Sequence, residues 1–274
     1  MPKTIIITGA SDGIGAAAVK RLHAMGHYVV VVGRDPERTR AVAEPLGAPY
    51  HLADFLVLDD VERLAGELLA NYPKMEVLAN NAGGTFEAPR ATTIDGHEKT
   101  FQLNYLSSWY LTDLLTERLV ENQATVINTS SMAHWLMSRF KIDDLELTKG
   151  WTPERAYGNA KLAMILHARQ LHDRYYAEGL KAISLHPGVI NSSFATGQEN
   201  RIGKLYSLAR RGFATPEDGA KQLIRFADQK AGLNYPSGRY FVNGSPAFTH
   251  PKAANDELAA RLWSLTEIML ASRR

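Results

Sequence analysis

The chain has no cysteine among its 274 residues. This absence excludes disulfide bonds, catalysis by a thiol and zinc sites that use cysteine ligands. No run of residues approaches the roughly 18 apolar positions that a membrane-spanning helix needs. The opening stretch MPKTIIITGA has only a short apolar run, so no signal peptide is predicted. We therefore expect a cytoplasmic protein without a membrane anchor.

An excess of charge of one sign is also lacking. The 31 Lys and Arg residues nearly balance the 29 Asp and Glu residues, which leaves a formal net charge of +2. This balance indicates neither a nucleic-acid partner nor binding to a membrane surface. Hydrophobic residues make up 45% of the chain, as in globular domains with a large core. No repeat, low-complexity tract or Pro/Gly/Ser-rich linker interrupts the sequence, so we predict one domain over residues 1–274.

Short apolar runs that alternate with helical patterns indicate the fold class. TIIIT (Thr4–Thr8) and HYVVVVG (His27–Gly33) are rich in β-branched residues and nearly continuous, as buried strands are. This alternation predicts an α/β fold, a doubly wound Rossmann-type domain whose parallel sheet of about seven strands has helices on both faces. The other expected strands are Ala48–Asp54, Met75–Gly83, Ala124–Ser131, Lys181–Gly188 and Gly238–Val242. The expected helices are Gly13–Met25, 35–46, 57–71, 94–120, 154–177, 203–211, 216–229 and a C-terminal helix, with irregular structure over 132–153.

The stretch TGASDGIG (Thr8–Gly15) follows the first expected strand and opens the first expected helix. Its glycines, Gly9, Gly13 and Gly15, allow a tight turn and a close approach of the backbone to a pyrophosphate. The helix that follows would offer its N–H groups and positive dipole to the same anion. An ordinary glycine-rich turn is the alternative, but the position directly after the first strand favours a dinucleotide site.

The second expected strand ends at Gly33-Arg34-Asp35. An acid near this position commonly holds the ribose 2′-hydroxyl of NAD, whereas an arginine accommodates the 2′-phosphate of NADP. Arg34 has the charge and planar shape that suit a phosphate, and Asp35 is explained as the N-cap of a helix that begins with Pro36. The sequence therefore favours NADP as cofactor. Asp12 adds an opposing negative charge, and NAD stays an alternative.

The stretch AYGNAKLAMIL places Tyr157 and Lys161 four residues apart in an expected helix, so their side chains share one face. Such a pair arises readily by chance in a chain with 11 tyrosines, and a solvated helix face would explain it. Other motifs, however, occur with it in a fixed order. These are TGASDGIG, NNAG (Asn80–Gly83), FQLNYL with Asn104, INTSS with Ser131, AYGNAK and HPG (His186–Gly188).

With these motifs the chain resembles the classical short-chain dehydrogenases/reductases from about Lys3 to Gly244. The stretches SSMAH, TPEDGA and SGRYFVN further resemble the retinol-dehydrogenase-like branch of that family. The resemblance implies one nucleotide-binding domain that carries its own substrate pocket. It also implies hydride transfer between a nicotinamide and a carbonyl or alcohol carbon.

The resemblance also implies which residues carry the chemistry. The tetrad would be Asn104, Ser131, Tyr157 and Lys161. Ser131 is preferred to its neighbour Ser130 because it matches the second serine of the family's Asn-x-Ser-Ser pattern. The expected cofactor-binding residues are Gly9, Ser11, Asp12, Gly13, Ile14, Gly15, Arg34, Asp54, Asn81, Ala82, Gly83, Tyr157, Lys161, Pro187, Gly188, Val189 and Ser192.

The tetrad has a physical rationale. Tyrosine has a reference pKa of about 10 and is a poor base at neutral pH. A cation such as Lys161 favours the phenolate, so the pair is predicted to act as a general acid/base on the substrate oxygen. Ser131, at the end of a strand, could donate a hydrogen bond to that oxygen. Asn104 lies in mid-helix, where Asn is disfavoured, and the family implies a helix kink and a water that relays protons to Lys161.

The segment between Ser131 and Tyr157 is longer than is usual in the family. The extra residues, about 132–153, are predicted to shape the mouth of a substrate pocket, and about 189–212 are predicted to form a lid. The expected apolar wall of the pocket consists of Trp135, Leu136, Met137, Phe140 and Trp151. No metal site is predicted, because His134, His167 and His186 lack the spacing of metal ligands and are interpreted as structural or surface residues.

These observations favour an NADP-dependent oxidoreductase that interconverts a carbonyl and an alcohol on a small lipophilic substrate. Two alternatives stay open: an NADP-binding sensor or scaffold with little turnover, and an NAD-linked alcohol dehydrogenase. The resemblance implies a homo-oligomer, a dimer or tetramer, that pairs through the helices carrying Asn104 and Tyr157. The sequence does not identify the physiological substrate.

Overall fold

The computed structural model describes residues 1–188 and 215–273. The expected lid at 189–212 and the expected helix at 203–211 lie outside the described residues.

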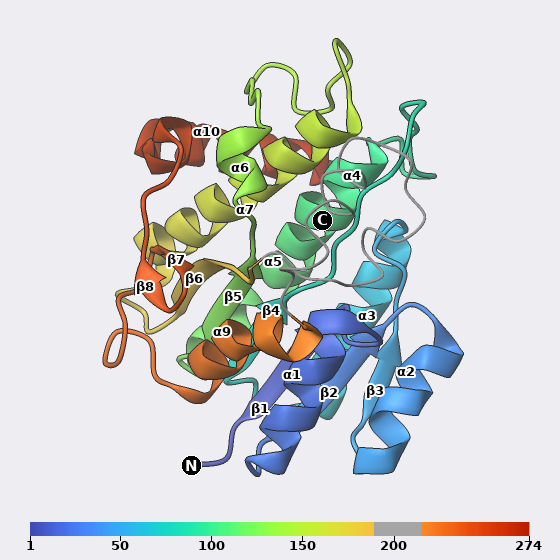
Figure 1. Cartoon of the computed structure of the whole chain (residues 1–274), viewed down its shortest axis with the longest axis vertical. Helices are drawn as coiled ribbons and strands as arrows, with labels where there is room; N and C mark the ends of the chain where they lie inside the picture. Colours follow the sequence, from blue (N-terminus) through green and yellow to red (C-terminus); the bar gives the residue numbers. More distant parts are fainter. Residues whose placement is uncertain (189–214, 274) are drawn as a thin grey trace.

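The described strands form one sheet of eight strands in the order β3-β2-β1-β4-β5-β6-β7-β8. All neighbouring pairs are parallel except β7 and β8, which confirms the predicted doubly wound arrangement (Figure 1). The strands are β1 (Thr4–Thr8), β2 (Tyr28–Gly33), β3 (Tyr50–Leu52), β4 (Val77–Asn80), β5 (Thr125–Thr129), β6 (Lys181–His186), β7 (Tyr240–Val242) and β8 (Ser245–Pro246).

The eighth strand was not expected from the sequence. It is only two residues long and pairs antiparallel with β7 through a turn at Asn243 and Gly244, whose φ angles are 50° and 75°. Two consecutive positive φ angles are what a tight hairpin turn requires, and Asn-Gly is the dipeptide best suited to it. The dipeptide was therefore a usable signal, although β8 itself is too short to show a hydrophobic pattern.

The central strands are buried on both faces, and this explains their continuous apolar sequences. Ile5 and Ile7 of β1 belong to one core with α1 (Gly13–Ala24) and α9 (Pro216–Asp228), which lie side by side (Figure 1). Ile6 points to the opposite face and belongs to a second core. Successive side chains of a strand point to opposite faces, so a run of three isoleucines serves both cores.

Helices cover each face of the sheet. The first core is completed by α2 (Pro36–Ala43), whose N-cap Asp35 accepts a hydrogen bond from the backbone N–H of Arg38 at 2.9 Å, as predicted. The second core contains residues of the helices α3 (Leu58–Asn71), α5 (Ser107–Glu121), α7 (Pro153–Tyr175) and α10 (Asp256–Met269). The short helical segments are η1 (Glu44–Leu46), α4 (Lys99–Phe101), η2 (Gln102–Leu106), α6 (Ala133–Leu136), η5 (Pro251–Ala254) and η6 (Ala271–Arg273).

Two predicted segments are wrong in detail. The helix expected from residue 94 begins at Lys99, because Glu98 caps it by accepting from the N–H of Phe101 at 2.7 Å. Its next five residues, η2, form a π-helical turn before α5 continues. The segment 132–153, expected to be irregular, contains the short helix α6.

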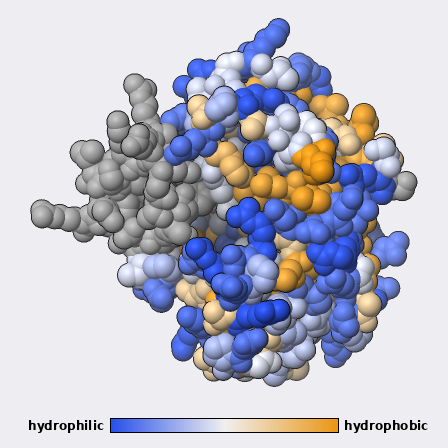
Figure 2. Space-filling model, turned by 90° about the vertical axis from the view of Figure 1, so that its right-hand side faces the viewer, coloured by the Kyte–Doolittle hydropathy of each residue, from blue (hydrophilic) through white to orange (hydrophobic). Residues whose placement is uncertain are grey.

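The C-terminal helix α10 packs on α5 and α7. Trp263 of α10 lies with its ring centroid 5.0 Å from that of Trp109 on α5, and the Arg174 guanidinium lies 4.6 Å from the centroid of Trp263. Within the described residues, no helix combines the length and apolar character needed to cross a membrane. On the face drawn in Figure 2, hydrophilic side chains predominate and hydrophobic ones gather mainly in the upper half.

A histidine buried in the core makes the fold sensitive to acid. His167 of α7 is 2% exposed, and its Nδ1 lies 3.2 Å from the Asn128 side-chain nitrogen. The rings of Tyr105 and Trp263 flank it at centroid distances of 6.2 and 5.9 Å. Burial lowers the pKa of His167 from 6.5 to about 3, because the imidazolium would lose its hydration there.

We therefore expect the thermal midpoint to fall as the pH is lowered from about 6.5 toward 3. The unfolded chain binds a proton at His167 in this range and the folded chain does not, so protons favour unfolding. The variant His167→Asn should be less stable at pH 7 but should lose less stability between pH 7 and pH 4. Melting curves over this range, with His23→Asn at a partly exposed position as control, provide the test. An unchanged pH slope in His167→Asn would contradict the assignment.

Candidate active site

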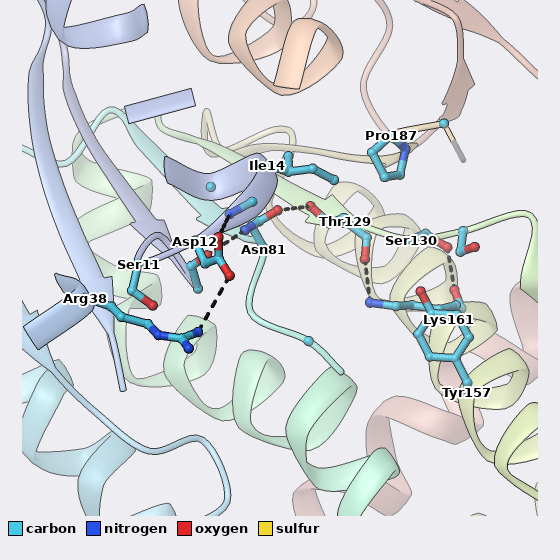
Figure 3. Close-up of a pocket in the computed structure, with 16 residues that line it drawn as sticks. Ser11, Asp12, Ile14, Arg38, Asn81, Thr129, Ser130, Tyr157, Lys161 and Pro187 are labelled. Atoms are coloured by element: carbon cyan, nitrogen blue, oxygen red, sulfur yellow. Dashed lines mark hydrogen bonds and ion pairs between the residues drawn. The ribbon is translucent and has the colours of Figure 1, made fainter. Parts of the chain in front are cut away.

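The predicted site residues lie at the carboxyl ends of neighbouring parallel strands, where ligands bind in open α/β sheets. Gly9 follows β1, Asn81 follows β4, Ser131 follows β5 and Pro187 follows β6. They line a cleft of about 290 Å³. Its lining consists of Gly9, Ser11, Asp12, Gly13, Ile14, Gly15, Arg38, Asn81, Gly83, Thr129, Ser130, Ser131, Tyr157, Lys161, Pro187 and Gly188. Figure 3 shows Arg38 and Asp12 at one end of the cleft and Tyr157 and Lys161 at the other.

The glycine-rich loop has the geometry that its glycines predict. Gly9 has a φ of 62°, and a Cβ on it would lie 2.6 Å from the Cα of Ala82. A Cβ on Gly15 would clash with the carbonyl oxygen of Gly9. Any side chain at these positions would push the loop away from β4 or from the first turn of α1. The loop therefore leaves a bare backbone beside the start of a helix, which fits the pyrophosphate of a dinucleotide.

Asn81 ties this loop to the neighbouring strands. Its Nδ2 donates to the carbonyl oxygens of Thr8 and Gly9 at 3.1 and 3.2 Å, and its Oδ1 accepts from the Thr129 hydroxyl at 3.3 Å. The Thr8 hydroxyl in turn accepts from the N–H of Ala82 at 3.0 Å. The ends of β1, β4 and β5 are therefore held together by side chains as well as by the sheet.

Lys161 is the most deeply buried charged group of the site. Its side chain lies on α7 one turn after Tyr157, and Nζ is 5.4 Å from the centroid of the Tyr157 ring. Lys161 is 3% exposed, and Nζ donates to the carbonyl oxygen of Thr129 at 3.0 Å (Figure 3). Burial lowers the pKa of Lys161 to about 7, because the ammonium loses its hydration. An anionic group nearby would favour the charged form of Lys161.

The two neighbouring serines have different environments. Ser130 is 1% exposed, and its hydroxyl donates to the carbonyl oxygen of Lys161 at 2.7 Å. The Ser131 oxygen accepts a hydrogen bond from the N–H of Ala133 at 3.2 Å, and this acceptance leaves the hydroxyl proton to be donated elsewhere. The geometry therefore favours Ser131 over Ser130 as the hydroxyl that serves the cleft.

Asn104 lies in the π-helical turn η2. Its Nδ2 donates to the carbonyl oxygens of Thr100 and Gly84, each at 2.8 Å, and its Oδ1 accepts from the N–H of Gly84 at 3.2 Å. A Cβ on Gly83 would lie 2.7 Å from this Oδ1 and 3.1 Å from Nζ of Lys161. Because Gly83 has no side chain, the space beside both Asn104 and Lys161 stays open.

A second cleft of about 700 Å³ adjoins the glycine-rich loop and is lined by Ser11, Arg34, Arg38 and Asp54 among others. Arg34 Nη1 lies 4.0 Å from Asp54 Oδ2, and Arg38 Nη1 lies 3.7 Å from Asp12 Oδ2. Both arginine side chains are 65% exposed. Arg38 was missed in the sequence; it lies in the first turn of α2, whereas Arg34 precedes the N-cap Asp35.

The insertion is anchored to the helix that carries Tyr157. A Cβ on Gly158 would lie 2.6 Å from the backbone nitrogen of Ser138, so only glycine allows this approach. The side-chain oxygen of Asn159 accepts from the N–H of Arg139 at 2.8 Å. One predicted wall residue is wrong: Phe140 is 3% exposed and packs in the second core. The Phe140 ring packs among apolar side chains of the second core instead.

The other predicted wall residues have mixed positions. Trp135 and Leu136 on α6 are 47% and 63% exposed, and Trp151 donates from Nε1 to Glu98 Oε1 at 3.1 Å. The predicted cofactor contacts Val189 and Ser192 lie outside the described residues. His134, His167 and His186 are buried, and no three His, Asp or Glu side chains within the described residues are grouped to hold a metal ion.

The chain belongs to the short-chain dehydrogenase family, whose model matches residues 3–202. Among curated proteins it is similar to retinol dehydrogenase 12 of Mus musculus, with 33% identity over 96% of this chain and 85% of that protein. It is also similar to DnrU of Streptomyces sp. (strain C5), whose name describes a daunorubicin C-13 ketoreductase, with 34% identity over 95% of this chain and 90% of that protein.

Two solved structures add to this comparison. An uncharacterized protein from Mycobacterium paratuberculosis has 29% identity and a TM-score of 0.76, over 98% of this chain and 95% of that one. RhlG of Pseudomonas aeruginosa, solved as an active-site complex with NADP, has 25% identity and a TM-score of 0.70, over 88% of this chain and 95% of that one. The protein is therefore an oxidoreductase of a family that uses NAD(P) and acts on an alcohol or carbonyl group.

The burial of Lys161 leads to a test of its cost to stability. Because its pKa is lowered to about 7 in the folded chain, the fold loses stability as the pH falls from 10.5 to 7. We expect Lys161→Met, of similar length, to raise the free energy of unfolding at pH 7 by about 1–3 kcal/mol while abolishing turnover. Urea denaturation at pH 7 and pH 9.5 should show a smaller gain at the higher pH. A loss of stability in Lys161→Met, or an equal gain at both pH values, would contradict this expectation.

Proposed function

We propose that the protein is an NADP-dependent oxidoreductase that interconverts a carbonyl and an alcohol on a small lipophilic substrate, with Tyr157 as the general acid/base. The observation that carries the proposal is the convergence of Tyr157, the Lys161 ammonium and Ser131 on the cleft that the glycine-rich loop also lines. A phenol, a buried cation and a hydroxyl donor are the groups needed to exchange a proton with a substrate oxygen. When bound, the cofactor supplies or accepts the hydride.

The protein's own residues account for the proton chemistry. In reduction, the Tyr157 hydroxyl donates its proton to the substrate oxygen, and the Lys161 cation stabilises the phenolate that remains. Ser131 donates a hydrogen bond to the same oxygen, since its own oxygen already accepts from Ala133. Asn104, held against Gly84, positions water for reprotonation through Lys161. Oxidation follows the same path in reverse.

The preference for NADP is supported by two arginines rather than one. Arg34 and Arg38 line the cleft beside the glycine-rich loop, and their guanidinium groups are exposed. Planar guanidinium groups suit a phosphate dianion. The NADP bound to RhlG, a relative of similar fold, supports the same choice. Asp12, 3.7 Å from Arg38, is the observation that favours NAD, because it competes for one of the two cations.

The substrate class is proposed from the names of the relatives and from α6. Retinol and daunorubicin, named in two relatives, are small molecules that each contain an extended apolar carbon skeleton. Trp135 and Leu136 expose apolar surface one turn after Ser131, and such surface gains about 25 cal/mol per Å² when a lipophilic molecule covers it. We extend the proposal to a cytoplasmic location and a homo-oligomer. In the oligomer, α5 and α7 would pair through the part of their outer surface that α10 leaves open, because α10 packs on both helices.

Tyr157→Phe is expected to lower kcat by about 10²- to 10⁴-fold with a lipophilic ketone or aldehyde and NADPH. Phe keeps the ring and removes only the proton donor, so the NADPH dissociation constant should change by less than about threefold. Initial rates at the NADPH absorbance and cofactor titration measure the two quantities. Tyr175→Phe, at the far end of the same helix, is the matched control. Turnover near the wild-type value in folded Tyr157→Phe would refute the role.

Arg34→Ala and Arg38→Ala are each expected to weaken NADPH binding by about tenfold or more, and the double variant by more still. NADH binding should change little, because NADH lacks the 2′-phosphate. Asp12→Asn should strengthen NADPH binding, since it releases Arg38 from its ion pair. Titration of both cofactors against the four variants gives the comparison. Equal losses for NADPH and NADH would assign the arginines a structural role only.

A further inference from the structure

We propose that His134 is a positioning residue for Ser131, which it holds in the conformation that presents the hydroxyl to the substrate. This inference rests on the role proposed for Ser131. His134 lies on α6, three residues after Ser131, and is 2% exposed. It does not line the cleft with Tyr157 and Lys161, so it would act through Ser131 and not on the substrate.

The backbone carbonyl of Ser131 is held twice by the same residue. It accepts from the His134 backbone N–H at 3.1 Å and lies 2.6 Å from Nδ1 of the His134 ring. The Ser131 hydroxyl oxygen accepts from the N–H of Ala133 at 3.2 Å. Both polar oxygens of Ser131 are thus fixed by residues of α6. Rotation of the Ser131 peptide group would break the short hydrogen bond to the buried imidazole. Rotation of the Ser131 side chain would break the hydrogen bond from the Ala133 N–H.

The contacts of the imidazole assign its tautomer. Nδ1 faces a carbonyl oxygen, which can only accept, so Nδ1 carries the proton. Nε2 lies 3.4 Å from the backbone N–H of His250, which can only donate, so Nε2 is the acceptor. Burial lowers the pKa of His134, which keeps the ring neutral and preserves this pattern. One buried side chain therefore links Ser131 to the segment that follows β8.

Neighbouring groups hold the ring in place. The Tyr240 ring of β7 packs edge-on against His134 with a centroid distance of 4.9 Å, and the Ser138 hydroxyl donates to the His134 carbonyl at 2.6 Å. On the other side of the turn, the Met132 N–H lies 3.4 Å from Nδ1 of His186 in β6. The turn that carries Ser131 is thus clamped between two imidazoles, one from the insertion and one from the sheet.

The test replaces His134 by Asn or by Gln, because the side-chain amide of each can stand in for only one of the two ring nitrogens. In His134→Asn the amide nitrogen takes the place of Nδ1 and keeps the bond to the Ser131 carbonyl. In His134→Gln the amide takes the place of Nε2 and loses that bond. We expect kcat to fall about 10- to 100-fold in His134→Gln and His134→Ala, and much less in His134→Asn. The NADPH dissociation constant should stay within about threefold in all three variants.

A double-mutant cycle with Ser131→Ala separates positioning from general destabilisation. If His134 acts through Ser131, adding His134→Ala to Ser131→Ala lowers kcat by less than about threefold further. The proposal would be overturned if the losses in kcat of the two single variants multiply in the double variant. It would also be overturned if kcat among the His134 variants followed their melting temperatures and not the presence of a hydrogen-bond donor at the Nδ1 position. Normal turnover in His134→Ala beside a crippled Ser131→Ala would overturn it while leaving the proposed function intact. Normal turnover in Ser131→Ala itself would refute the role of Ser131, and the proposal with it.

Discussion

The burial of the Lys161 ammonium group is the constraint around which the site is arranged. A buried cation costs several kcal/mol unless polar groups replace its water. The Thr129 carbonyl, 3.0 Å from Nζ, provides one such group at the end of β5, and the Ser130 hydroxyl holds the Lys161 backbone carbonyl at 2.7 Å. On the remaining side, Gly83 leaves room that a Cβ would fill at 3.1 Å from Nζ. The end of β5 and Gly83 after β4 thus both lie beside Nζ of Lys161, which α7 supplies.

The strand order makes this meeting possible. Because β4 and β5 are parallel neighbours, their carboxyl ends lie side by side, and Asn80 donates to the Asn128 side chain across them at 3.0 Å. Once α7 is fixed by Lys161, Tyr157 lies one turn away at the same edge of the sheet. The glycine-rich loop after β1 adjoins β4 at the same level. The glycine-rich loop, where we propose that the cofactor binds, and Tyr157 with Lys161, where we propose that the proton is transferred, therefore line one continuous cleft.

The sequence predicted features that depend on neighbouring residues. Ile5–Ile7 as a buried strand and Asp35 as an N-cap were confirmed, since periodicity and caps are local. Features set by distant contacts could not be predicted. The π-helical turn forms at Asn104, whose side-chain nitrogen donates to the carbonyl oxygen of Thr100 and also to that of Gly84, twenty positions earlier in the chain. Phe140 was misassigned because an aromatic residue in an insertion fits a core as well as a pocket.

The position of the insertion between Ser131 and Tyr157 creates a problem that the fold solves at both ends. Extra residues could displace either group, and hydride transfer tolerates errors of about 1 Å poorly. The first end is fixed by His134 and by the close contact of Ser138 with Gly158. The second end is fixed by Thr152, which caps α7 by accepting from the N–H of Arg155 at 3.2 Å. The residues between these anchors can therefore differ while the distance between Ser131 and Tyr157, the two proposed catalytic groups, stays constant.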